Sequence, residues 1–130
     1  MPMAAPDPGA AWCAQSATGF GSRLPTSTAI GTGRANTGII VEACGTDSAA
    51  GRAAAYRGGG KSDWFLPSKD ELNQLWSSKA VVSGLGDGTF WSSSQNAGFT
   101  VSAWCQTFAN GTQGDNYKDD GGQVRPVRAF

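Results

Sequence analysis

The sequence predicts an α+β domain in which helices precede a twisted antiparallel sheet. Its 130 residues fit a single domain spanning 1–130. Nineteen glycines and a charged fraction of only 15% favour many turns over long helices. Apolar residues recur at helical spacing in the first half and alternate after Gly84, which places two or three helices before the strands.

The first half of the chain is expected to hold two helices after an irregular start. Residues 1–35 are rich in Pro, Gly, Ser, Thr and Ala, which predicts a loop with one short strand. Apolar residues at helical spacing predict a helix over 36–44, which Gly45 would end. The alanines of 48–56 predict a second helix that stops at the glycines of 58–60.

A short strand and a third helix are expected next. Residues 63–66 form a short apolar run that a proline ends, which predicts a strand. Ser68 and Glu71 then form a capping-box pattern, in which the Ser68 hydroxyl accepts from an amide of the first helical turn and the Glu71 carboxylate accepts from the Ser68 amide. The helix of two to three turns that follows has an apolar stripe made of Leu72, Leu75 and Trp76.

The last third is expected to consist of strands. Residues 89–92 and 101–108 have the alternation of strands, and a turn at 110–111 joins the second of them to 113–118 in a hairpin. Residues 124–130 predict a last strand, and their proline suits an edge or a bulge.

The alternation also predicts which side chains are buried. In the strand over 101–108, Trp104 and Phe108 share a face with Gln106, so we expect that face in the core and Cys105 and Thr107 pointing outward. The predicted core consists of large apolar side chains: Trp64, Phe65, Leu72, Leu75, Trp76, Trp91, Trp104 and Phe108.

Composition argues against several classes of function. Ten basic and ten acidic residues give a net charge of zero, whereas a nucleic-acid-binding protein should carry a basic excess. The chain has no histidine, which excludes Ser–His and Cys–His catalysis and His-ligated zinc. It lacks an apolar run that could insert in a membrane, and its N-terminus lacks the pattern of a signal peptide. We therefore expect a non-catalytic binding module that uses no cofactor and no metal.

Three motifs resemble ligand sites without meeting their requirements. Gly58–Ser62 looks like the end of a phosphate-binding loop, but Ala55 stands where the first glycine belongs. Gly31–Asn36 lacks the third glycine of a dinucleotide fingerprint. An acidic run could hold calcium but lacks the spaced ligand order, so a solvated polar loop is the favoured interpretation of Asp115, Asn116, Asp119 and Asp120.

Four separate motifs, together with Ile30–Thr37 upstream, occur in the order typical of one family. They are Gly59–Asn73, Phe90–Ser94, Ala103–Phe108 and Val124–Phe130. In these motifs the sequence closely resembles the C-terminal domain family of the Legionella collagen-like protein adhesin. The resemblance implies a C-type-lectin-like fold, related to that of formylglycine-generating enzymes, in bacterial surface and secreted proteins. The adhesin binds host glycosaminoglycans as a trimer, and similar domains are variable proteins of diversity-generating retroelements.

The resemblance implies an extracellular, cell-surface or virion-surface module for adhesion or ligand binding, with a variable C-terminal face that recognises a glycan or a protein. It also implies a homo-oligomer, a trimer in the adhesin. The alternatives are a structural or assembly domain of a surface or virion component, and an enzyme of the formylglycine-generating type. The enzyme would need reactive cysteines close together, but Cys105 stands alone after Cys44.

The expected ligand surface lies between Ser92 and Lys118. Outward positions of the strand over 101–108, the loop before it and the hairpin after it would form one surface. Phe99 and Tyr117 would supply contact area among adaptable polar residues. An exposed Cys105 would fit a surface randomised by a retroelement; the alternative is a small buried residue beside an ordinary solvated face. The predicted ligand-binding residues are Ser94, Gln95, Asn96, Phe99, Cys105, Thr107, Asn110, Gln113, Asp115, Asn116 and Tyr117.

Two further expectations concern the N-terminal third. Cys13 and Cys44 flank the same irregular loop, and an exported domain is in oxidising conditions, so we expect a disulfide between them; three separate thiols are the alternative. Members of the family begin with a strand that pairs with the C-terminal strand. This chain starts almost directly at the loop, so we expect that strand to come from elsewhere, such as a neighbouring subunit.

Overall fold

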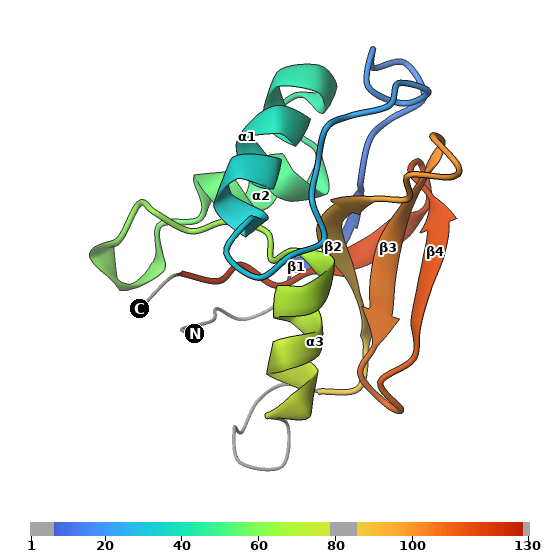
Figure 1. Cartoon of the computed structure of the whole chain (residues 1–130). Coiled ribbons are helices and arrows are strands. Elements are labelled where there is room, and N and C mark those ends of the chain that lie inside the picture. Colours follow the sequence, from blue (N-terminus) through green and yellow to red (C-terminus); the bar gives the residue numbers. More distant parts are fainter. Residues whose placement is uncertain (1–6, 79–85, 129–130) are drawn as a thin grey trace.

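The computed structural model describes residues 7–78 and 86–128 and shows three helices packed against one five-stranded sheet (Figure 1). The α+β class is therefore confirmed. The helices are α1 (Gly33–Cys44), α2 (Ala49–Ala55) and α3 (Lys69–Ser77). The strands are β1 (Asp7–Ala11), β2 (Thr89–Gln95), β3 (Ser102–Thr107), β4 (Gln113–Tyr117) and β5 (Gly121–Val124).

The sheet has the strand order β1-β5-β2-β3-β4 and is mixed. The pairs β2–β3, β3–β4 and β1–β5 are antiparallel, as expected, but β5 runs parallel to β2 where Gln123 meets Phe90. The expectation of a wholly antiparallel sheet is wrong at this pair. The cause is the strand order. β5 follows β4 in sequence but pairs with β1 and β2, so no hairpin joins it to a neighbouring strand and forces an antiparallel direction.

The first strand belongs to this chain. β1 pairs with β5 through Asp7–Val124, Ala10–Gly122 and Ala11–Gly121, with a shift in register between Asp7 and Ala10. The expectation that this strand is supplied from elsewhere is wrong. Its sequence, Asp-Pro-Gly-Ala-Ala, lacks any alternation, and tertiary contacts hold it in place: the Trp91 indole donates to Ala10 O at 2.9 Å.

Two segments predicted as strands are not strands. Apart from Val124, which ends β5, the described residues of 63–66 and 124–130 form only one isolated antiparallel bridge, between Phe65 and Val127. A proline follows the first segment and another lies within the second, and a proline has no amide hydrogen with which to extend a ladder. Residues 129–130 lie outside the described part of the chain.

The helix ends follow the predicted signals closely. α1 begins at Gly33, one turn before the expected Asn36, and ends at Cys44; Gly45 caps it with a φ of 86° that suits glycine. At α2 the Ser48 hydroxyl accepts from the Gly51 amide at 3.0 Å. None of the helices in the described part of the chain is long and apolar enough to cross a membrane.

The capping box of α3 is confirmed. The Ser68 hydroxyl accepts from the Glu71 amide at 3.2 Å, and Glu71 Oε1 accepts from the Ser68 amide at 2.8 Å. The same carboxylate also reaches the preceding loop, because Oε2 accepts from the Gly31 amide at 3.0 Å. Glu71 is buried, so this helix cap is part of the interior.

The interior consists of two clusters on opposite faces of the β2–β3 pair. Trp91 lies opposite Cys105 and Phe90 opposite Gln106, and adjacent residues of a strand point to opposite faces. The first cluster contains Ala10, Trp12, Cys13, Ile40, Ala49, Ala50, Ala53, Leu66, Trp91, Ala103, Cys105 and Val124. The second contains Phe65, Leu72, Leu75, Phe90, Phe108 and Val127.

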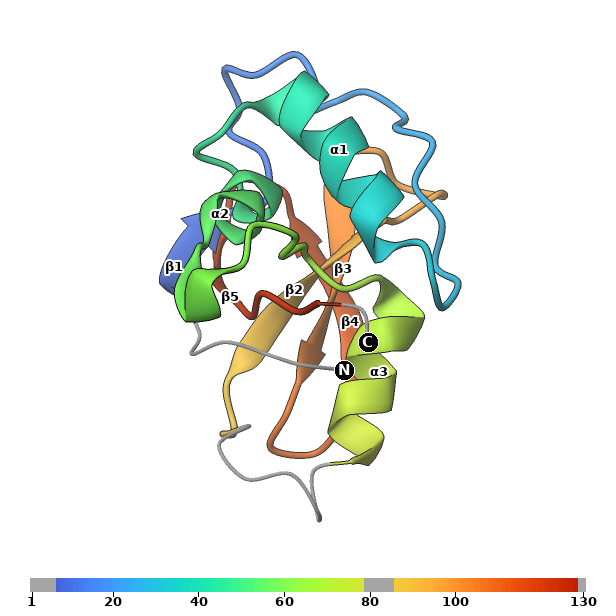
Figure 2. The same ribbon diagram turned by 90° about the vertical axis from the view of Figure 1, so that its left-hand side faces the viewer.

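The helices form two groups: α1 and α2 lie together, and α3 lies apart from them (Figure 2). α1 packs on α2 and β2, α2 packs on β5 and β1, and α3 packs on β2 and β3. Most of the predicted core residues are buried accordingly, but Trp64, Trp76 and Trp104 are only half-buried.

The predicted exposure of Cys105 is wrong. Gln106 and Phe108 are buried as expected, yet Cys105 is only 8% exposed. The strand is covered on both faces, because Ala103 and Cys105 pack in the first cluster with the indoles of Trp12 and Trp91. The alternation of side-chain direction along β3 therefore could not show which of its residues are buried and which are exposed.

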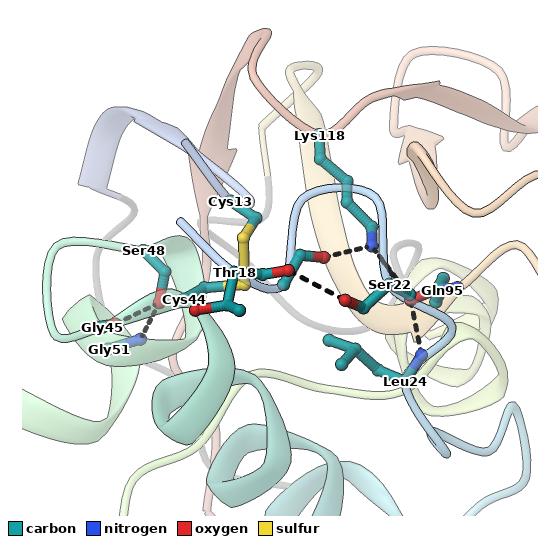
Figure 3. Close-up of a disulfide and its surroundings, with 11 residues drawn as sticks. Cys13, Thr18, Ser22, Leu24, Cys44, Gly45, Ser48, Gly51, Gln95 and Lys118 are labelled. Carbon is teal, nitrogen blue, oxygen red and sulfur yellow. Dashed lines mark hydrogen bonds between the residues drawn. A yellow bond between two sulfur atoms is a disulfide. The ribbon is translucent and has the colours of Figure 1, made fainter. Parts of the chain in front are cut away.

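The structure joins Cys13 and Cys44 in a disulfide between the N-terminal segment and the end of α1 (Figure 3). Beside it the Gly19 amide donates to Ala43 O at 3.0 Å. Cys105 is a free, buried thiol. The disulfide and this backbone bond attach the irregular segment after β1 to α1.

Two glycines of α1 offer a matched pair of substitutions. An added Cβ at Gly33 would lie 2.3 Å from Glu71 Oε1 and 2.8 Å from Leu66 O, whereas at the exposed Gly38 it would meet nothing within 4 Å. Gly38→Ala should raise the free energy of unfolding by about 1 kcal/mol through helix propensity. Gly33→Ala should lower it, because the backbone of Leu66 must move. Chemical denaturation measures both, and two variants of equal stability would contradict the close packing at Gly33.

Thiol counting tests the disulfide. Unreduced protein in denaturant should react with one equivalent of a thiol reagent, at Cys105 alone, and three equivalents would refute the bond. Reduction should lower the free energy of unfolding by about 3–4 kcal/mol for a loop of roughly 30 residues in the chain-entropy description. A Cys105→Ala protein should react with no reagent before reduction, which makes it the control.

Candidate ligand-binding site

A buried lysine organises the chain behind the candidate site. The Lys118 side chain is fully buried, and Nζ donates to Gly19 O (2.8 Å), Ser22 O (3.3 Å) and Gln95 Oε1 (3.0 Å) (Figure 3). The ammonium also lies 5.0 Å from the centroid of the Trp12 ring. Burial lowers the pKa of Lys118 to about 8. Its oxygen partners and the indole compensate in part for the lost hydration.

Lys118 directs its neighbour outward. Successive residues at the end of β4 alternate in direction, so the inward ammonium of Lys118 is matched by an outward ring at Tyr117, which is 54% exposed. Phe99, from the loop between β2 and β3, is 46% exposed and meets Tyr117 edge-on, with 5.8 Å between ring centroids. Two large exposed aromatic side chains in mutual contact are uncommon on a surface that has no partner.

The two rings border a polar pocket of about 220 Å³. Asp115 lies in its wall, and Oδ2 of that carboxylate accepts from Ser102 Oγ at 2.8 Å and from Asn96 Nδ2 at 3.0 Å. The residues that line this pocket come from β3, β4 and the loop before them: Phe99, Ser102, Asp115, Asn116 and Tyr117.

A second pocket of about 400 Å³ also has Tyr117 in its wall. It is lined by residues from the N-terminal segment, from the position before β3, from the end of β4 and from the turn after it: Gln15, Phe20, Val101, Tyr117, Asp119 and Asp120. Tyr117 thus borders both pockets. We call the surface formed by Phe99, Asp115, Tyr117, Asp119 and Asp120 the aromatic–acidic surface.

Trp104 adjoins this surface on the same face of the sheet. It is the cross-strand partner of Asp115, so the two side chains point the same way. Trp104 is only half-buried, and the ammonium of Lys69, the first residue of α3, lies 3.8 Å from the centroid of its ring.

The structure brings together five of the predicted ligand-binding residues and separates the others. The five residues that border or support the first pocket are Asn96, Phe99, Asp115, Asn116 and Tyr117. Thr107 and Asn110 lie at the opposite end of the β3–β4 hairpin, and Gln113 is half-buried, its amide donating to Lys69 O at 2.9 Å.

Three predicted ligand-binding residues are buried in structural roles, so placing them on the surface is wrong. Ser94 Oγ donates to Ser27 O at 2.8 Å, and Gln95 Oε1 accepts from the Leu24 amide and from Lys118. Cys105 packs in the first cluster, and its pKa is raised by burial and then by the charge of Asp115. The polar side chains of Ser94 and Gln95 suggested that these residues are exposed. They are buried because the N-terminal segment packs on β2 and hydrogen-bonds to them.

Sequence reasoning missed part of the site. Ser102 is buried yet lines the first pocket, and Gln15 and Phe20, which line the second, lie 80 or more residues from Tyr117 in sequence. For Asp119 and Asp120 the sequence predicted a solvated polar loop, in preference to a calcium site, and gave no sign of a pocket wall. They line a different pocket from Asp115, and the described residues contain no group of three or more acidic or cysteine side chains that could hold a metal ion.

Comparison with protein families matches residues 9–128 to the Lcl C-terminal domain. The match covers nearly the whole chain, from β1 to the segment after β5. The chain belongs to the Legionella collagen-like protein C-terminal domain family. Membership of this family is compatible with a place on a bacterial surface. No curated protein matches the sequence.

The buried lysine of this Lcl-family domain predicts a pH-dependent stability. Because the pKa of Lys118 falls from 10.5 to about 8 on folding, the unfolded chain binds more protons between these values. The free energy of unfolding should therefore rise with pH from about 8 to 10.5, by at most about 3 kcal/mol from this group. Lys118→Met should lose this rise, as measured by denaturation in a Cys105→Ala background that removes thiol ionisation. Parallel pH profiles in both proteins would contradict the assignment.

Proposed function

We propose that this domain is a non-catalytic ligand-binding module of C-type-lectin-like architecture, displayed on a bacterial surface, that recognises a glycan or a protein. The observation that carries the proposal is the contact between Phe99 and Tyr117. These rings are exposed and touch each other; both border one pocket, and Tyr117 also borders a second. Rigid exposed aromatics beside short polar side chains are the composition of known recognition surfaces.

The chemistry of the remaining groups supports a binding role over an enzymatic one. The sequence has no histidine to act as a general base near neutral pH. The free thiol, Cys105, is buried and its pKa is raised, which disfavours the reactive thiolate. Lys118 is engaged by three oxygens of the framework.

The position of the surface is also consistent with retroelement diversification, which we propose for the exposed residues near Tyr117. Asn116 and Tyr117 are exposed and belong to neither core cluster, so substitution there leaves the core contacts unchanged. The burial of Cys105 removes one argument for this idea, because an exposed lone cysteine was expected as a product of randomisation.

An assembly role is the second candidate function. β4 is an edge strand of the sheet, and such an edge can pair with a strand of another chain. This role would place Asp115, Asn116 and Tyr117 within an interface. Self-association lost on Tyr117→Ala, without any external ligand, would favour assembly.

The recognition proposal is tested with glycan and protein arrays followed by affinity measurements on the hits. Tyr117→Ala and Phe99→Ala should each weaken binding by about fivefold to thirtyfold, the range of interface anchors. Ile30→Ala removes another exposed apolar side chain, and Thr107→Ala changes the far end of β3, so both should stay within about twofold of wild type. Wild-type affinity in the two aromatic variants, with circular dichroism unchanged, would place the site elsewhere.

A further inference from the structure

We infer that the aromatic–acidic surface takes a cationic side chain, an arginine or a lysine, presented by a protein partner. This inference rests on the proposed function and specifies the partner. A cation can lie against the face of an aromatic ring while it pairs with a carboxylate at the side. Tyr117 and Phe99 supply the rings, and Asp115 supplies a carboxylate in the wall of the same pocket.

The geometry around Tyr117 suits such a group. The Tyr117 and Phe99 planes meet at 64°, and both rings line the pocket of about 220 Å³ that they share with Asp115. Oδ2 of Asp115 is fixed by hydrogen bonds from Ser102 and Asn96, which orients the carboxylate before any ligand arrives. Oδ1 has no hydrogen-bond partner among residues 7–78 and 86–128. A guanidinium or ammonium donor could take that oxygen.

The charged side chains that line the two pockets beside Tyr117 are all acidic. Asp115 lines one pocket, Asp119 and Asp120 line the other, and no lysine or arginine is among the residues that line either. The two nearby ammonium groups are already engaged. Lys118 points inward to Gly19, Ser22 and Gln95, and Lys69 lies on Trp104. Within the described chain these three carboxylates form no salt bridge, so they favour a cationic partner and repel a sulfated or carboxylated one.

The same face already accommodates one such contact. The Lys69 ammonium lies 3.8 Å from the Trp104 ring centroid, and Trp104 is the cross-strand partner of Asp115. An ammonium over an aromatic ring, next to this carboxylate, is therefore compatible with the local packing. Phe99 and Tyr117 repeat the aromatic half of that arrangement without a cation from the described chain.

The test compares two labelled peptides that differ in charge but little in shape, hexa-arginine and hexa-citrulline, by fluorescence polarisation on the folded protein. Hexa-arginine should bind at least about tenfold more tightly than hexa-citrulline. Asp115→Asn and Tyr117→Ala should each weaken hexa-arginine binding by about threefold to tenfold. Asp47→Asn makes the same change in net charge at an exposed residue outside both pockets, so it should stay within about twofold of wild type.

Each other outcome overturns the inference. Equal affinity for the two peptides, absence of hexa-arginine binding, or an equal loss in Asp47→Asn and Asp115→Asn would each refute a specific cation site. If an array glycan binds instead and Tyr117→Ala weakens it, the recognition function stands and the cationic partner is wrong. If Tyr117→Ala and Phe99→Ala leave every array hit and both peptides unchanged, the recognition function and the cationic partner both fail.

Discussion

The fold depends on hydrogen bonds to the backbone amides and carbonyls of a long irregular segment that packs against the core. Residues 12–32 contain no regular element, so few of their amides and carbonyls can pair within the segment. Polar side chains from distant elements supply the missing partners. Asn36 bonds both the amide and the carbonyl of Ser27, and Gln95 accepts from the Leu24 amide. These buried amides and hydroxyls act as structural connectors, because an unmade buried hydrogen bond would cost more than each one contributes.

The same constraint connects the helices to the site. Glu71 caps α3 and holds the Gly31 amide, so one carboxylate fixes both the start of a helix and the loop that leads into α1. Lys118 plays the corresponding role at the end of β4, where its ammonium binds the carbonyls of the loop near Gly19. Because Lys118 must point inward to do this, Tyr117 points outward. The proposed recognition surface is therefore a consequence of the buried network behind it.

In this arrangement the residues that hold the irregular segment in place differ from the residues that form the proposed recognition surface. The side chains that hold the segment, such as Ser94 and Gln95, are buried and hydrogen-bonded, whereas Phe99 and Tyr117 contact mainly each other and solvent. Substitution of the first kind leaves buried polar groups without partners, while substitution of the second kind changes little in the core. A surface of this kind suits a recognition module whose contacts change while its fold is kept.

The sequence by itself determined the elements that local chemistry specifies. The capping box at Ser68, the end of α1 at Gly45 and the turn before β4 follow from residue type and spacing, and the family followed from motifs in order. Only the tertiary structure decided that β1 belongs to the sheet, that β5 runs parallel to β2, and that Cys105 is buried. Periodicity reports one covered face, whereas β3 is covered on both, by α3 and by the segment that carries Trp12. The covering by the Trp12 segment comes from residues more than 80 positions away, and no local pattern in a strand can report it.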